Sequence, residues 1–146
     1  MNWNRNKSVA LSRVCLIVFA AMLLCLDAGA YWFSRWFFSA EGSRWVFLMI
    51  TVYSASIFAW ICLYMLWRLT GNIRKGEVFV RENVTYLRAV SWCCAAVGVI
   101  CLASVLYYLS FAFVAIAAGF MSLIVRIVKN VVDEAIGMKS ELDLTV

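Results

Sequence analysis

Ala89–Val125 is a run of 37 residues without a single charged side chain. As one helix it would reach about 55 Å at 1.5 Å per residue, whereas the hydrocarbon core of a bilayer is about 30 Å thick. We therefore expect the run to fold back as two spans, with a turn near Tyr107–Ser110. The run needs lipid as its solvent, because 66% of the 146 residues are hydrophobic and only 14% are charged, against about 25% charged in soluble domains.

Two further apolar runs precede this one, so the sequence predicts an all-α integral membrane protein with four transmembrane helices in an antiparallel bundle. The expected spans of this single membrane domain, 1–146, are residues 9–27, 45–67, 89–107 and 111–128, with a cytoplasmic loop at 68–88 and a cytoplasmic tail at 129–146. Small residues four positions apart, such as Ala115 and Gly119, favour a close hairpin of the last two spans and leave a homo-oligomer open.

The distribution of Lys and Arg predicts the orientation. Four spans place 11 of the 13 basic residues on one side of the membrane and only Arg35 and Arg44 on the other. Because the basic side faces the cytoplasm, we expect both termini in the cytoplasm. A basic start, an apolar run and Ala28-Gly29-Ala30 also leave a cleaved signal peptide open for the first segment.

Two segments beside the spans have an amphipathic pattern. The aromatic residues between the first two spans share one helical face, which predicts a short interfacial helix on the outer leaflet, with a ligand-capturing cap as the alternative. They are Trp32, Phe33, Trp36 and Phe37. The tail is expected to continue the fourth helix as an amphipathic extension that Gly137 loosens. Its apolar stripe consists of Val128, Val131, Val132, Ala135 and Leu142.

Side chains that carry chemistry are scarce within the spans. Six cysteines lie inside them and the chain has no histidine, so we interpret the thiols as packing residues and expect no metal, cofactor or catalytic site. Asp27 falls at the outer end of the first expected span, within reach of water. No carboxylate is then expected at mid-membrane, which argues against proton-coupled transport.

Polar residues gather instead in the cytoplasmic segments. Asn83 is expected to cap the third helix, and Phe79 to tuck against the bundle or a partner. Loop cations and tail carboxylates would attract each other into one surface. The candidate partner-docking residues are Arg74, Lys75, Phe79, Arg81, Asn83, Arg88, Asp133, Glu134, Glu141 and Asp143.

The loop sequence GNIRKGEVFVRENVTYLR and the terminal pattern Glu-x-Asp-Leu-Thr-Val at residues 141–146 carry a resemblance. Together they resemble a family of uncharacterised four-helix bacterial membrane proteins, the domain of unknown function 2975. The resemblance covers nearly the whole chain and implies no catalytic residues. Some members are encoded beside small helix-turn-helix regulators, which implies a membrane partner for a cytosolic DNA-binding protein.

The leading hypothesis is a non-enzymatic membrane protein that acts as a sensor or as a docking or regulatory partner for a cytosolic protein. The alternative is a small permease, a channel or a transporter subunit with hydroxyl groups along a neutral path, and an intramembrane redox enzyme comes third. The chain itself is not expected to bind nucleic acid, because no such motif interrupts its apolar runs.

This topology is testable with reporter fusions. Fusions at residue 40 should report the outer side of the membrane, and fusions at residues 76 and 146 the cytoplasmic side, because the basic segments stay inside. Paired alkaline phosphatase and fluorescent-protein reporters measure this directly. A C-terminal reporter on the outer side would eliminate the four-span arrangement.

Overall fold

The computed structural model describes residues 2–37 and 44–145, and every regular element within them is an α-helix. The helices are α1 (Asn2–Phe37), α2 (Arg44–Lys75), α3 (Arg81–Ser104) and α4 (Phe111–Leu144). Each is long and apolar enough to cross a membrane, where a helix satisfies its own backbone hydrogen bonds without water. The expectation of an all-α chain with four membrane-crossing helices is confirmed.

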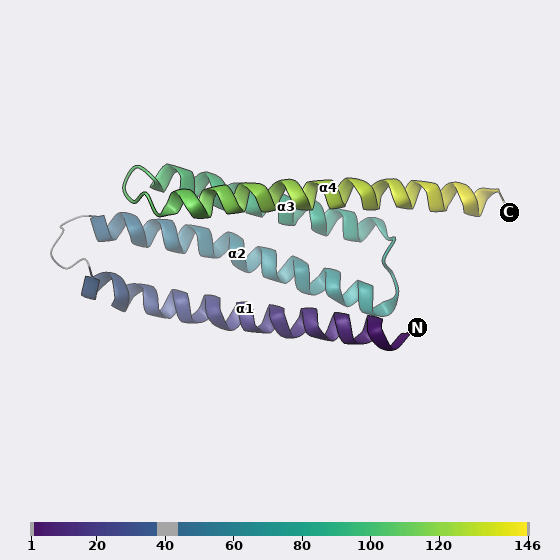
Figure 1. Ribbon diagram of the computed structural model, residues 1–146, viewed down its shortest axis with the longest axis horizontal. Helices are drawn as coiled ribbons and strands as arrows, with labels where there is room; N and C mark the ends of the chain where they lie inside the picture. The colour runs from purple at the N-terminus through teal and green to yellow at the C-terminus, as the bar shows by residue number, and fades with distance from the viewer. Residues whose placement is uncertain (1, 38–43, 146) are drawn as a thin grey trace.

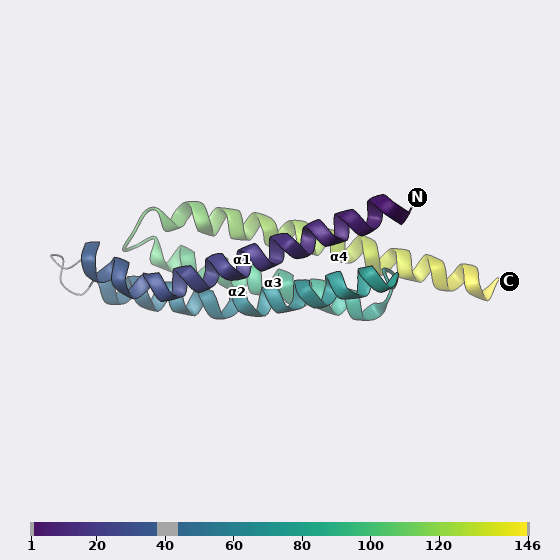
Figure 2. The same cartoon turned by 90° about the horizontal axis from the view of Figure 1, so that it is seen from below.

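Successive helices run in opposite directions and each packs against the next one along the chain (Figure 1). Within the described residues, the helix pairs in contact are α1 with α2, α2 with α3, and α3 with α4. Viewed from below, α1 and α4 lie on the same side of the α2–α3 pair (Figure 2). The arrangement is therefore open along one side, where α1 and α4 do not meet.

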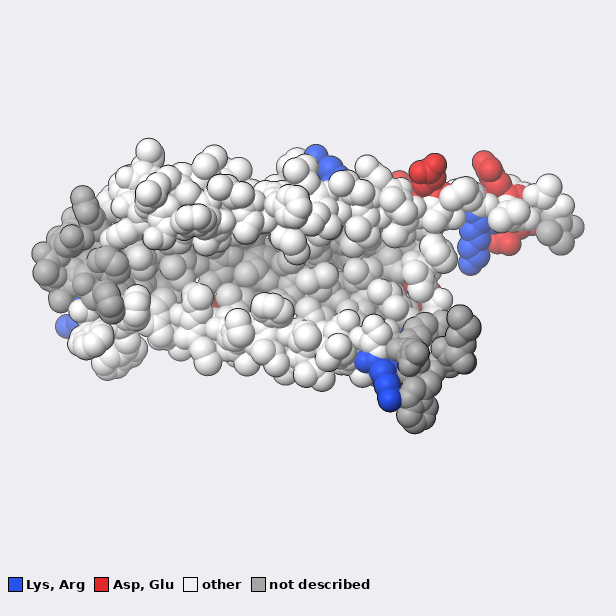
Figure 3. All heavy atoms as spheres, in the orientation of Figure 1, with Lys and Arg blue, Asp and Glu red and all other residues white. Residues whose placement is uncertain are grey.

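A lengthwise groove of about 740 Å³ occupies this open side. All four helices contribute to its wall, which is apolar apart from a few hydroxyl and thiol groups. The space-filling view shows the hollow between the upper and lower rows of side chains (Figure 3). In a bilayer such a groove is exposed to acyl chains.

The closest helix pair is α3 with α4. Ser91 donates to the backbone oxygen of Ser122 at 3.1 Å, and Ser122 donates to the backbone oxygen of Ser91 at 2.9 Å. A Cβ atom at Gly98 would lie 3.6 Å from the backbone of Ala115 and of Gly119. Small residues thus let the two backbones approach closely. Such close packing is typical of membrane helices, because in lipid the hydrophobic effect does not drive helices together.

The turn that divides the long apolar run contains neither Gly nor Pro, yet it forms at residues 105–110. Ser104 ends α3, and its hydroxyl lies 2.7 Å from that of Thr51 on α2. Tyr107 stacks on Phe47, with ring centroids 4.7 Å apart. Side-chain contacts with α2 therefore hold the turn where a glycine would otherwise supply the bend.

The first helix continues further than the sequence pattern predicted, and the fourth continues through the tail, where the sequence already predicted a helix. Residues 30–37 are the last turns of α1 rather than a separate interfacial helix, and the remainder of that expected segment, 38–43, lies outside the described residues. The fourth helix runs unbroken past Gly137 to Leu144. A helical glycine costs only about 1 kcal/mol relative to alanine, so one glycine need not interrupt a long helix.

Candidate functional site

The loop between α2 and α3 begins with a glycine-terminated helix end. Gly76 has a φ of +87°, a left-handed conformation that costs glycine little. The N–H of Gly76 donates to the oxygen of Ile73, and the N–H of Glu77 donates to the oxygen of Asn72, both at 3.1 Å. This pair of hydrogen bonds is the Schellman motif, which ends α2 sharply and leaves the five residues 76–80 as the connection to α3.

Asn83 holds this connection in place. Its side chain is only 2% exposed, and its Nδ2 donates to the backbone oxygens of Glu77 at 2.8 Å and Val78 at 2.9 Å. Its Oδ1 accepts from Nδ2 of Asn72 at 2.9 Å. The prediction that Asn83 caps α3 is wrong, because Val80 is the N-cap and Asn83 lies inside the first turn.

The burial of Asn83 also removes it from any surface that a partner could touch. Its role is to lock the loop to the end of α2, and the loop then presents other side chains. Phe79 remains 49% exposed, and it contacts solvent rather than tucking under the helices. The basic docking candidates Arg74, Lys75, Arg81 and Arg88 are also exposed.

Two small basic pockets flank the loop on different helix pairs. Arg74 lines a pocket of about 470 Å³ with Arg13 of α1. Arg88 lines another, of about 350 Å³, with Arg126 and Lys129 of α4. The predicted basic surface is therefore divided between the two sides of the α2–α3 pair.

Two arginine–tryptophan pairs join neighbouring helices at a level suited to the membrane–water interface. The guanidinium carbon of Arg13 lies 5.2 Å from the ring centre of Trp67, and that of Arg126 lies 5.8 Å from that of Trp92. Both contacts are within the range of cation–π attraction. Arg and Trp are typical of the membrane–water interface, so these pairs indicate one boundary of the bilayer.

Beyond that level, α4 projects past the other helices (Figure 1). Ser91 of α3 pairs with Ser122 of α4, and the two helices run in opposite directions. Arg81, at the start of α3, is ten residues before Ser91. It therefore lies about level with Val132, which is ten residues after Ser122. The next twelve residues, 133–144, stand beyond α3. At 1.5 Å per residue they extend about 18 Å. We call residues 133–144 the overhang.

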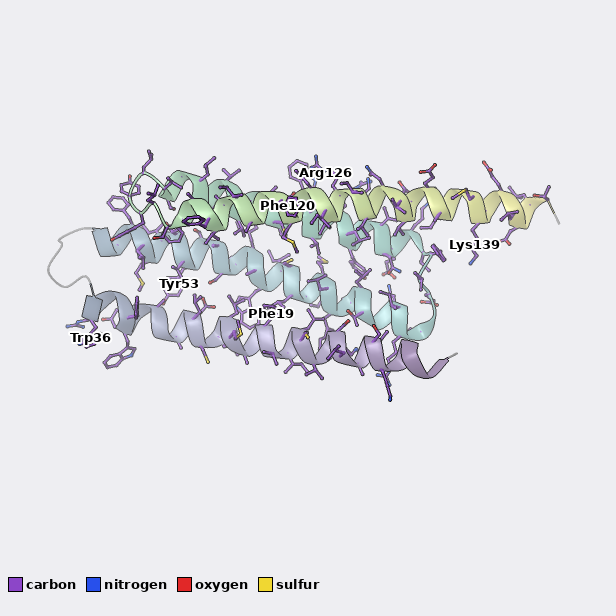
Figure 4. The ribbon with its side chains drawn as sticks, viewed as in Figure 1. Phe19, Trp36, Tyr53, Phe120, Arg126 and Lys139 are labelled. Carbon is purple, nitrogen blue, oxygen red and sulfur yellow. The ribbon has the colours of Figure 1, made fainter. Side chains whose placement is uncertain are left out.

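The overhang carries the four acidic docking candidates. They are Asp133, Glu134, Glu141 and Asp143, and Lys139 is the single basic residue among them (Figure 4). Charged side chains visible in Figure 3 gather at this end of the molecule. Among the described residues no ion pair joins the overhang to the loop, so the predicted attraction between tail and loop does not draw them into one surface.

A second polar site lies between α1 and α2. Asp27 accepts hydrogen bonds from Ser56 at 2.5 Å and from the indole N–H of Trp60 at 3.1 Å. Tyr53 donates to the backbone oxygen of Asp27 at 3.2 Å. We call Asp27, Ser56 and Trp60 the intramembrane cluster.

The position of this cluster along its helices differs from the one that the sequence suggested. Because α1 continues to Phe37, Asp27 lies ten residues before the end of that helix and six residues before Phe33, where its candidate span ends. Ser56 likewise lies ten residues inside the candidate span that begins at Val46, which corresponds to about 15 Å. Ser56 and Trp60, four residues apart on one face of α2, were the overlooked signal, because a carboxylate between two apolar helices needs such donors.

The thiols are distributed over several helices. Cys62 of α2 and Cys94 of α3 line the groove together with Cys15 and Cys93. Within the described residues, no three Cys, Asp or Glu side chains gather in a way that could hold a metal ion.

Comparison with known protein families matches nearly the whole chain. The family model described as "Protein of unknown function (DUF2975)" matches residues 5–146. The chain belongs to this family. No curated protein and no solved structure matches significantly. Within the matched region lie the Asn72–Asn83 lock, the intramembrane cluster and the overhang.

The lock is testable by substitution. Asn83→Ala should lower the stability of the purified protein by about 2–3 kcal/mol, since it leaves two carbonyls and the Asn72 amide without their partner. Thr85→Ala is the matched control, because Thr85 is exposed and bonds only within its helix. Thermal unfolding in detergent measures both. Equal melting temperatures for the two variants would contradict the assigned role.

Proposed function

We propose that this chain is a non-enzymatic docking protein of a bacterial cytoplasmic membrane, which holds a cytosolic regulatory protein at the membrane surface. In this proposal the four helices form an antiparallel bundle with both termini in the cytoplasm. The aromatic end of α1 lies at the outer interface, and the overhang is a cytoplasmic extension. The distribution of 11 basic residues against 2 across the expected spans supports that orientation.

The overhang is the observation that carries the proposal. A membrane anchor needs only enough helix to cross the bilayer, yet α4 continues well beyond the arginine–tryptophan level and beyond α3. Four carboxylates stand on this segment, free of ion pairs with the loop. They would be repelled by anionic headgroups, so a lipid surface is a poor partner for them.

The charge of the overhang indicates the chemistry of the partner. Four carboxylates against one ammonium group complement a basic protein face, and complementary charge speeds association and selects partners. DNA-binding regulators carry such a face. Docking there would keep DNA from the same surface, so that the membrane protein regulates by sequestering its partner.

Charge reversal at the overhang tests this proposal. A photo-crosslinking residue at position 140 should capture a cytosolic protein in intact cells, and the captured protein can then be identified and purified. Its affinity for the membrane protein in nanodiscs should fall at least tenfold in an Asp133→Lys/Asp143→Lys variant, because two attractive charges become repulsive.

Glu77→Lys provides the control for that experiment. It changes one carboxylate to an ammonium group in the exposed loop, away from the overhang. Its affinity for the purified partner should stay within about twofold of the unaltered chain. Unchanged affinity in the overhang variant, or an equal loss in both variants, would refute docking on this segment.

The intramembrane cluster favours one other function. An ionisable side chain at membrane depth is a mark of proton or ion pathways, and Asp27 meets that description with two donors of α2 directed at its carboxylate. The alternative is therefore a small permease or channel, or a transporter subunit, in which Asp27 carries a proton between the two sides of the membrane.

Proton flux separates this alternative from a structural role. If Asp27 carries protons, proteoliposomes under an imposed pH gradient should take up protons, and Asp27→Asn should abolish the uptake while keeping the hydrogen bonds. If it is structural, Asp27→Asn should behave like the unaltered chain. Asp27→Ala should then cost about 0.6–1.7 kcal/mol, the range of interhelical hydrogen bonds in membranes. Fluorescence of an entrapped pH dye and thermal unfolding in detergent measure the two effects.

A further inference from the structure

The overhang has an apolar edge as well as acidic ones. Apolar residues follow one another along α4 at alternating spacings of three and four, from the arginine level into the overhang. They are Val128, Val131, Ala135, Met138 and Leu142. This is the a/d pattern of a coiled coil over two heptads. We call these five residues the seam.

In the part of the chain that the structure describes, the overhang residues of the seam are covered by no other helix. Val131 is 61% exposed, Met138 55% and Leu142 68%. The residues of α4 that face α3, among them Ser122, lie on a neighbouring stripe. Apolar side chains projecting into water along one line of a helix indicate a surface that a partner covers.

The membrane surface is not available to cover the seam. Because α4 is one continuous helix from Phe111 to Leu144, its last turns leave the bilayer along the helix axis instead of lying on the headgroups. Leu142 is thirteen residues beyond Lys129, which corresponds to about 20 Å.

We propose that a second copy of this chain covers the seam, and that the two α4 helices form a parallel coiled coil at the membrane surface. Two copies inserted in the same orientation and at the same depth present their α4 helices parallel and in register. A two-fold axis along the membrane normal then places each seam residue against its equivalent. A seam only two heptads long gives weak association by itself. Membrane insertion has already aligned the two helices, so less orientational freedom is lost when they associate, and this offsets the weakness.

The charges beside the seam favour a second copy over another occupant. With Val128, Ala135 and Leu142 at a positions, Glu134 occupies a g position and Lys139 the following e position. In a parallel pair, a g residue lies beside the e residue five positions later on the other helix. Glu134 of each copy therefore faces Lys139 of the other copy. Because the dimer is two-fold symmetric, this attractive ion pair forms twice.

These two residues cannot pair within one helix. Residues five apart on an α-helix point about 140° apart, whereas helix neighbours are three or four apart. The inference does not rest on the docking function, since the carboxylates used to test docking, Asp133 and Asp143, lie at outward f and b positions of the same heptads.

Disulfide trapping locates the interface. In membranes carrying the full chain, Met138→Cys at a d position should form disulfide-linked dimers on mild oxidation, and Ser140→Cys at an outward f position should form several-fold fewer. The unaltered chain gives the background of its own six cysteines. Equal trapping at both positions, or Met138→Cys linked instead to a different protein, overturns the proposal.

Charge exchange then tests the pairing itself. Glu134→Lys and Lys139→Glu should each weaken dimerisation on the order of tenfold, since two attractions become two repulsions. The Glu134→Lys/Lys139→Glu double variant should restore it. Energy transfer between differently labelled copies in nanodiscs measures the dissociation constant, and circular dichroism checks that each variant remains helical. Failure of the double variant to recover, or a monomer throughout, overturns the proposal.

Discussion

The close approach of α3 and α4 at their two serines determines the register on which the rest of the structure depends. Ser91 and Ser122 each donate to the other's backbone oxygen, which is possible only where no larger side chain separates the helices. Gly98 continues that contact toward the turn. Sliding α4 by one turn would break the serine pair, and lipid offers those hydroxyls no substitute partner.

That register has consequences at the end of the molecule where both chain termini lie (Figure 1). It brings Arg88 of α3 to Arg126 and Lys129 of α4, which concentrates positive charge where the helices reach the headgroups. It also leaves the last twelve residues of α4 beyond α3, because α4 is the longer helix on that side. The overhang is thus a product of helix length and serine register together.

Hydrogen bonds attach the other two helices in the same way. The hydroxyls of Thr51 and Ser104 join α2 to α3 near the turn, and the intramembrane cluster joins α1 to α2. Among the described residues α1 packs on α2 and on no other helix, so the hydrogen bonds of Asp27 help to attach α1 to the bundle. A carboxylate that accepts hydrogen bonds from a hydroxyl and an indole N–H of the neighbouring helix can therefore be structural.

Docking and pairing would use different faces of one helix. A second copy on the seam leaves Asp133 and Asp143 directed outward, and two overhangs side by side would present twice the number of carboxylates to a partner. A dimeric regulator could then engage both, and two linked contacts bind more tightly than either alone.

Much of the fold follows from the sequence by itself. An uncharged run too long for one span requires a turn, and the basic segments together with the apolar runs are enough to predict four helices. The Ser and Gly spacing on the last two spans also pointed to their close packing. These features depend on composition and helical period, which are local properties of the chain.

Only the tertiary structure decided what each polar side chain does. Asn83 is of a residue type that often caps helices, yet its side-chain amide forms hydrogen bonds with Asn72 and with two loop carbonyls. Asp27 resembles a residue at the rim of a span, yet α1 continues beyond it and Ser56 and Trp60 of α2 lie opposite. Sequence period places a residue on one face of its own helix, but its hydrogen-bond partners come from another helix, so depth and pairing emerge only when the helices pack.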